Sequence, residues 1–244
     1  MKKFLVALTT VMTASAANAA DLPRAPVYKA VAAPAAVSWT GFYIGANAGG
    51  AWGRGCWTFI GTVPPVGLPA PLDEGCNSPN GGIVGGQVGY NWQSGPLVFG
   101  LEAQGNWANL RGQNISLLPS PPFPPSTNRT RVDGLGLFTG RFGYAWGSTL
   151  LYAKGGAAVV HEDHDFALNG VVAPPIFASA TRWGGTIGGG VEHKFTQNWS
   201  GAVEYNYIAL GTSRLTFPSQ PLAAIVDINR DMHLLTLRVN YSLQ

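Results

Sequence analysis

The run His161-Glu162-Asp163-His164-Asp165 places two histidines and three carboxylates within five positions. Imidazole and carboxylate groups are ligands of divalent metals, so this run is the first candidate for metal chemistry in the chain. No helical pattern surrounds it to hold the side chains on one face. We therefore favour a solvated surface loop over a metal site, and we expect no cofactor.

Two cysteines, Cys56 and Cys76, are the only thiols in the sequence. In an exported protein such a pair predicts a disulfide, which we favour over metal binding by two lone cysteines. Closing the loop between Cys56 and Cys76 would stabilise the fold by about 3 kcal/mol on the chain-entropy model.

Nucleophilic catalysis by many hydrolases relies on a histidine with serine or aspartate partners. This chain contains no His-x-Ser pair. Strand parity directs His193 and His233 outward, away from any nucleophile that could be named. We therefore predict that the protein is not an enzyme.

The N-terminus has the three parts of a secretory signal. Lys2 and Lys3 precede an apolar stretch over 4–14, and Ala17-Asn18-Ala19 is a small-x-small cleavage site. The apolar stretch is shorter than the roughly 20 residues that a spanning helix needs, which disfavours an uncleaved anchor. We expect a signal peptide at 1–19, a Pro/Ala-rich periplasmic linker at 20–38 and one domain at 39–244.

Composition excludes several classes of protein. Removing the two signal lysines lowers the formal net charge from +3 to +1, and the chain has no basic cluster or motif for nucleic acid. Only 11% of residues are charged, against about 25% in soluble domains. The mature chain also lacks a long apolar run, so a membrane helix is not expected.

Alternation is the main structural signal. In 82–92 one parity is apolar or aromatic apart from glycine, while the other holds Gly85, Gln87, Gly89 and Asn91. Successive side chains of a strand point to opposite faces, so the pattern predicts a sheet with one oily and one polar face. Similar segments predict eight strands, at 41–53, 82–92, 97–109, 132–146, 150–160, 182–195, 199–210 and 231–243.

The connections alternate strictly between long and short. The long ones fall at 54–80, 110–131, 161–181 and 211–230, and the second is rich in proline, which cannot donate to a sheet ladder. Aromatic residues gather near the strand ends. These features predict an all-β, eight-stranded antiparallel up-and-down transmembrane β-barrel with long extracellular loops and short periplasmic turns. A soluble barrel would have its apolar face inside and its polar face outside. The four long loops on one side disfavour that alternative.

Charged residues of the polar parity fall at a common height near the short turns. They form an expected charge layer of three acids and three bases across the lumen, because eight strands leave room only for side chains and buried charges need partners. We favour a polar plug over a gate or narrow pore. The six residues are Glu102, Arg141, Lys154, Glu192, Glu204 and Arg238.

The stretch from Trp39 to Gly53, W-T-G-F-Y-I-G-A-N-A-G-G-A-W-G, follows the segment A-D-L-P-R-A-P-V-Y-K. Together they resemble the small outer-membrane immunogenic protein family of Gram-negative bacteria, a porin-superfamily group with an OmpA-like barrel. Supporting stretches are G-G-I-V-G-G-Q-V-G-Y-N-W, G-G-G-V-E-H-K-F and R-V-N-Y-S. Family members usually end on Phe as part of an assembly signal, whereas this chain has Leu243 followed by Gln244. The resemblance implies that Tyr241 and Leu243 carry recognition by the barrel-assembly machinery.

The expected protein is a monomeric barrel of the cell outer membrane, embedded in outer-membrane lipid and lipopolysaccharide. Its expected role is structural, contributing to envelope integrity, and the resemblance implies a surface antigen. Two alternatives remain open: a small diffusion porin, which needs an open lumen, and an adhesin or ligand receptor, which needs a partner for the loops.

Overall fold

Antiparallel strands make up almost all of the described chain. The computed structural model describes residues 37–119, 125–169, 176–218 and 223–243. In these ranges no helix is long and apolar enough to cross a membrane. The expected signal peptide and nearly all of the expected linker lie outside the described residues. The strands are β1 (Gly41–Val63), β2 (Leu72–Asn77), β3 (Asn80–Ser94), β4 (Leu97–Ile115), β5 (Ser126–Trp146), β6 (Thr149–Leu168), β7 (Ile176–Lys194), β8 (Trp199–Phe217) and β9 (Ala223–Leu243).

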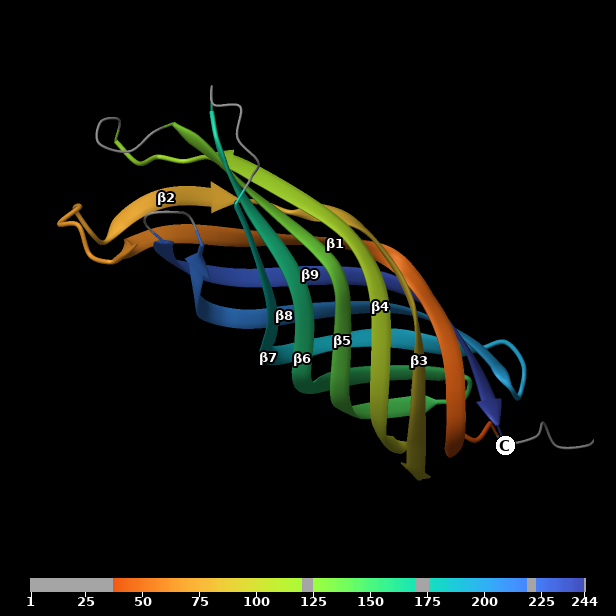
Figure 1. Cartoon of the computed structure of the whole chain (residues 1–244). Coiled ribbons are helices and arrows are strands. Elements are labelled where there is room, and N and C mark those ends of the chain that lie inside the picture. Colours follow the sequence, from red (N-terminus) through yellow and green to blue (C-terminus); the bar gives the residue numbers. More distant parts are fainter. Residues whose placement is uncertain (1–36, 120–124, 170–175, 219–222, 244) are drawn as a thin grey trace, which may run out of the picture. The chain divides into compact units, whose positions relative to one another are not determined.

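Eight of the nine strands form a closed ring. Each strand from β3 to β9 pairs with the next, and β1 closes the ring by pairing with β3 on one side and β9 on the other. Figure 1 shows these strands wrapping around a common interior. Closure leaves no free edge in the ring, so the backbone hydrogen bonds of each strand are met by its neighbours. The eight-stranded barrel is therefore confirmed.

The ninth strand, β2, was not predicted. It lies in the segment 54–80 and pairs with β1 from Gly55 to Phe59, beyond the point where β3 ends. It occupies the place next to β1 that β3 leaves empty, and so prolongs the wall (Figure 1). With six residues between proline-containing stretches, it is too short to show a clear alternation.

The predicted turns are where the structure has its short connections. Gly95 and Gly147 take positive φ values of 59° and 64° in two of them, a conformation that glycine adopts without steric cost. We call this the turn end of the barrel, and the opposite end the loop end.

The four predicted long loops are wrong in extent. The strands continue well into each of them and reach 15 to 23 residues in the ring, whereas a tilted strand needs only about 9–11 to span a bilayer. These extensions lie beyond the level at which the outer face meets lipid. Because neither face has to be apolar for lipid there, the alternation of apolar and polar residues is weaker in the sequence. The barrel wall therefore continues past the membrane at the loop end.

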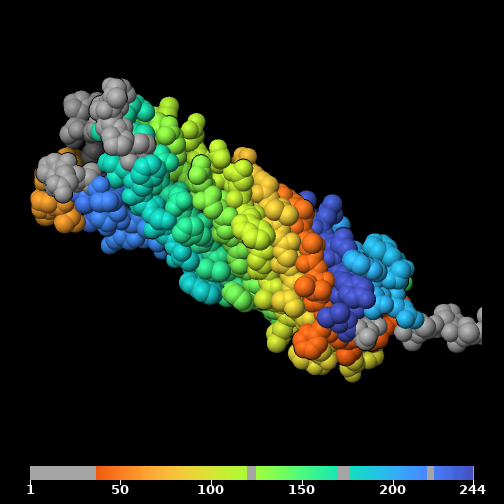
Figure 2. Space-filling model, turned by 45° about the vertical axis from the view of Figure 1, so that its right-hand side comes forward, coloured from red at the N-terminus to blue at the C-terminus, as the bar shows by residue number. Residues whose placement is uncertain are grey.

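The outer surface is apolar over its middle and ringed by aromatic residues. Leu101, Ile187 and Leu237 are each more than 60% exposed and belong to a long set of exposed large apolar residues on the wall, which soluble monomers rarely present to water. Figure 2 shows this wall, with the sequence colours running in order from orange to teal across neighbouring strands. Aromatic residues near the strand ends form two girdles on the outer face: Trp92, Trp146, Phe195, Trp199 and Tyr241 towards the turn end, and Trp52, Trp107 and Trp183 towards the loop end.

Candidate functional site: the barrel interior

The structure brings the six predicted charged residues together inside the barrel near the turn end. Each comes from a different strand, β4 to β9, and each is 5% exposed or less. Lys154 Nζ lies 2.9 Å from Glu102 and 2.7 Å from Glu204. Arg238 contacts the same two carboxylates from the other side. We call this group, with Arg141 and Glu192, the charge layer.

Two tyrosines complete the charge layer. Tyr43 and Tyr152 donate hydrogen bonds of 2.7 Å to Glu102 and Glu204 respectively. Arg141 lies over both rings, 5.3 Å and 4.5 Å from their centroids, and its guanidinium is 2.9 Å from Glu192. No role was predicted for either tyrosine, although both stand on the inward parity of their strands. Their signal was that parity, because a buried phenol needs an acceptor.

Above the charge layer lie buried amides such as Gln87, Gln104 and Asn106, and beyond them the interior becomes apolar. Twelve buried side chains form one cluster here, which we call the apolar belt, and seven of the eight ring strands contribute to it. Leu137, Ile208, Met232 and Leu234 are fully buried. The alternating pattern predicted a polar inner face along the whole strands, and at this level that prediction is wrong. The members are Ala51, Ile83, Leu110, Val132, Leu135, Leu137, Ala158, Val160, Ile208, Leu210, Met232 and Leu234.

A β-bulge in β5 contributes to this difference. The register between β5 and β6 shifts between Val132 and Gly134. Inward positions have odd numbers from Leu135 to Arg141, but Val132 is also fully buried. A bulge inserts one residue and reverses the parity beyond it. Asp133, which simple alternation places inside, is therefore exposed on the outer wall, and that expectation is corrected.

A second ionic cluster lies beyond the apolar belt. Glu162 is fully buried and accepts from His164 Nε2 at 3.1 Å, with Arg230 Nη1 at 3.4 Å and Arg182 Nη1 at 3.7 Å. Thr130 contacts His164 Nδ1 at 3.2 Å and accepts from Arg230 at 3.2 Å. We call Glu162, His164, Arg182 and Arg230 the upper cluster.

Glu162 and His164 lie beyond the membrane-spanning part of β6, and Arg182 reaches them from the position next to the girdle residue Trp183. His164 is five residues beyond Val159, the ladder partner of the girdle residue Trp183. Burial lowers the pKa of the His164 imidazole, so the ring is neutral near pH 7. Burial alone would raise the pKa of Glu162, but the hydrogen bond from His164 and the charge of Arg230 outweigh it and lower that pKa. A neutral His164 can donate to Glu162 through Nε2 and accept from Thr130 through Nδ1.

These positions correct the prediction for residues 161–165. They belong to β6 and not to a loop. Glu162 and His164 point inward, whereas His161, Asp163 and Asp165 point outward. Strand geometry thus separates the candidate ligands onto two faces. Among the residues that the structure describes, no group of three or more His, Cys, Asp or Glu could hold a metal ion.

The disulfide between Cys56 and Cys76 is present and joins β1 to β2, where the two cysteines are ladder partners. Glu74 of β2 is buried and accepts a 3.0 Å hydrogen bond from Asn128 of β5. The covalent bond and this contact together hold β2 against the barrel. Tyr241 and Leu243, the expected assembly residues, are exposed on the outer wall at the end of β9. Their expected role in assembly stays a prediction.

A closed ring with an apolar exterior, aromatic girdles and an interior filled by side chains defines a transmembrane β-barrel of the outer-membrane type. Residues 4–242 match the family model described as outer membrane protein beta-barrel domain. The chain belongs to that family and is a protein of the outer membrane.

Two relatives agree with this membership. The chain is 30% identical over 248 residues to the 31 kDa outer-membrane immunogenic protein of Brucella melitensis, covering 99% of both chains. It is 31% identical over 125 residues to the 22 kDa outer membrane protein of Rhizobium leguminosarum bv. viciae, which covers 50% of this chain and 51% of that protein. Among solved structures, the outer membrane protease OmpT of Escherichia coli is similar with a TM-score of 0.51 and 7% identity, covering 83% of this chain and 97% of that one. At that identity the likeness concerns the fold alone.

Proposed function

We propose that this protein is a closed structural barrel that contributes to envelope integrity and presents its loop end at the cell surface. The observation that carries the proposal is the filling of the interior at successive levels. Together, the charge layer, the apolar belt and the upper cluster take side chains from every strand of the ring, and these side chains are almost fully buried. An eight-stranded barrel has an interior that side chains can fill, and an apolar belt opposes the passage of hydrated ions.

The diffusion-porin alternative needs a water-filled path through all of these levels. In the described part of the chain, the fully buried Leu137 and Leu234 and the paired charges of Lys154 and Glu204 argue against one. Buried ion pairs resist separation because each charge would lose its partner in a low-dielectric site. The filled interior therefore supports the plug over the pore.

The proposed role as a surface antigen rests on the similarity to the outer-membrane immunogenic protein of Brucella melitensis and on the extended wall at the loop end. We infer that the same end is available for binding, as in the adhesin or receptor alternative. The protease in the structural comparison does not favour catalysis here, because the likeness concerns the fold alone. We propose that the protein is not an enzyme.

Single-channel conductance in a planar bilayer tests the closed barrel. The refolded full chain is first checked for heat-modifiable migration, which identifies a folded barrel, and an outer-membrane porin serves as the positive control. We expect no steady openings from the folded protein. Steady openings that appear only with folded protein would overturn the proposal and favour the porin.

A further inference from the structure

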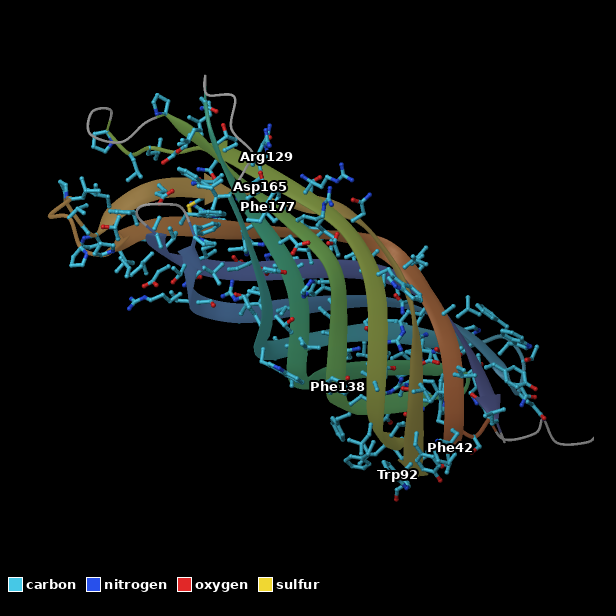
Figure 3. All side chains as sticks on the ribbon, viewed as in Figure 1. Phe42, Trp92, Arg129, Phe138, Asp165 and Phe177 are labelled. Carbon is cyan, nitrogen blue, oxygen red and sulfur yellow. A yellow bond between two sulfur atoms is a disulfide. The ribbon has the colours of Figure 1, made fainter. Side chains whose placement is uncertain are left out.

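A polar groove lies on the outer wall of the barrel just beyond the loop-end girdle. It has a volume of about 820 Å³ and is formed by β4, β5, β6 and β7 together with Ser78. Figure 3 shows three of its residues, Arg129, Asp165 and Phe177, gathered towards the end of the barrel away from Trp92 and Phe42. Arg111 follows the girdle residue Trp107 by four positions on the same face of β4. The groove therefore opens at the level where lipid headgroups meet the wall.

Two arginines in this groove face each other without a carboxylate between them. Arg111 and Arg131 are direct ladder partners on β4 and β5, an arrangement that is unfavourable for like charges unless an anion lies between them. Arg131 reaches Asp133 at 4.0 Å and has Asp163 as its ladder partner on β6. By contrast, no carboxylate of the described residues lies within ion-pair distance of Arg111, whose Nε donates to Asn109 at 3.1 Å. Guanidinium groups on neighbouring strands are suited to binding one phosphate or carboxylate between them.

The other lining groups suit a sugar. Arg129 is held by Asp165 at 3.4 Å, and Asp163 accepts from Ser179 at 2.6 Å. The groove also contains Gln113 and the ring of Phe177, which is 64% exposed. Carboxylates and amides bind hydroxyl groups, and an exposed ring covers the apolar face of a sugar. With three arginines and two aspartates, the lining keeps one net positive charge.

An apolar hollow lies on the same wall, within the membrane zone. Its volume is about 630 Å³ and its lining is almost entirely apolar. One ladder row crosses it in the order Leu101, Gly140, Gly155 and Ile187, from β4 to β7. The two glycines form the floor, while Leu101 and Ile187 stand on either side with more than 60% exposure.

Packing does not require glycine at these two positions. The nearest atoms to a Cβ would lie at about 4 Å for Gly140 and 3.5 Å for Gly155, which is ordinary contact. Small residues here therefore leave space for something outside the chain. Gly155 and Asp163 are eight residues apart on β6, or about 26 Å along the strand, so one amphipathic molecule with extended acyl chains can occupy both hollow and groove.

We propose that this strip of β4 to β7 is a binding site for lipopolysaccharide. The phosphorylated, acidic sugar headgroup lies in the groove between Arg111 and Arg131, and an acyl chain lies over Gly140 and Gly155. Charge complementarity selects the headgroup, and the apolar hollow below it selects a lipid rather than a free glycan or free phosphate. The site gives the barrel a fixed position in the outer leaflet.

Binding is measured on the refolded full chain in detergent micelles, by native mass spectrometry and by titration with lipopolysaccharide that lacks its O-chain. The double variant Arg111→Gln/Arg131→Gln should weaken binding by about tenfold or more, because charge-assisted hydrogen bonds to phosphate are lost. Its matched control, Arg54→Gln/Arg214→Gln, removes two exposed arginines outside the groove and should leave the affinity unchanged. Heat-modifiable migration shows that each variant is folded.

The hollow is tested separately by Gly140→Val/Gly155→Val, which fills it. This variant should weaken binding of intact lipopolysaccharide several-fold but leave binding of the deacylated headgroup unchanged. The control Gly105→Val/Gly185→Val alters two outer-face glycines with no atom near their Cβ positions and should bind as the wild type does. Equal losses in control and test variants, equally tight binding of dephosphorylated lipopolysaccharide, or full competition by inorganic phosphate alone would each overturn the proposal.

Discussion

The ammonium nitrogen of Lys154 lies 2.7 Å from Oε1 of Glu204, although the two residues belong to β6 and β8, which β7 separates. The contact therefore crosses the interior rather than following the ladder. Both side chains are 1% exposed or less. Each of these groups depends on the other, because a buried charge without a partner has lost its hydration without compensation.

Glu204→Gln should destabilise the barrel. The substitution leaves the charges of Lys154 and Arg238 with one carboxylate fewer, and breaking a buried pair in this way costs about 3 kcal/mol. Urea unfolding in detergent micelles, followed by tryptophan fluorescence, measures the change. Asp227→Asn is the control, because that carboxylate pairs with Arg214 on the exposed surface, where ion pairs contribute little. An unchanged midpoint for Glu204→Gln would contradict the charge layer as a stabilising network.

Leu137→Ala tests the apolar belt. Leu137 is fully buried inside the barrel, so truncation leaves a cavity and should lower the free energy of unfolding by about 2–5 kcal/mol. Leu237→Ala removes the same atoms from the outer wall, where the side chain is 66% exposed and detergent fills the space. We expect a much smaller effect from the second substitution in the same urea experiment. Equal effects would mean that the interior is not tightly packed.

The disulfide acts on β2 and not on the ring. The double variant Cys56→Ser/Cys76→Ser should make residues 60–75 more accessible to proteinase K, because β2 then keeps its ladder with β1 and the hydrogen bonds of Glu74 and Asn77 to β4 and β5 but loses its covalent bond. Loss of the disulfide should lower the free energy needed to open β2 locally by at most about 3 kcal/mol on the chain-entropy model. Mass spectrometry of early fragments locates the cuts. Heat-modifiable migration should stay the same, and its loss would show that the bond supports the whole barrel.

Strand parity predicted the turn end of the barrel well. There each strand has lipid on one face and a narrow interior on the other, so Arg141, Lys154 and Glu192 could be placed by counting from short turns. Their exact partners could not be predicted, because parity gives the face of a residue but not the height at which strands align. The tyrosines were overlooked because a phenol is compatible with either face.

The loop end was predicted poorly for two physical reasons. The bulge at Asp133 reverses the parity of β5 without a sequence signal that alternation alone can detect. Beyond the girdle the outer face meets water, so both faces of a strand can carry polar residues. On β6, for example, Asp163 points outward and Glu162 points inward. Alternation of polarity disappears there, and the strand around His164 was interpreted as a loop.

The upper cluster should make the barrel less stable in mild acid. Burial lowers the pKa of His164 in the folded state below its ordinary value of 6.5, so the unfolded chain binds more protons as the pH falls below that value. The contribution of neutral His164 to the free energy of unfolding is therefore fully present above about pH 6.5 and is lost progressively below that pH. The lowered pKa of Glu162 acts in the same direction at lower pH, starting below its ordinary value of 4.5.

Urea midpoints at pH 7.5 and pH 5 measure this loss of stability. His164→Gln should reduce the difference between the two midpoints, whereas His193→Gln, which alters an exposed histidine bound to Thr149, should retain it. If both variants keep the full difference, the acid sensitivity arises elsewhere in the barrel.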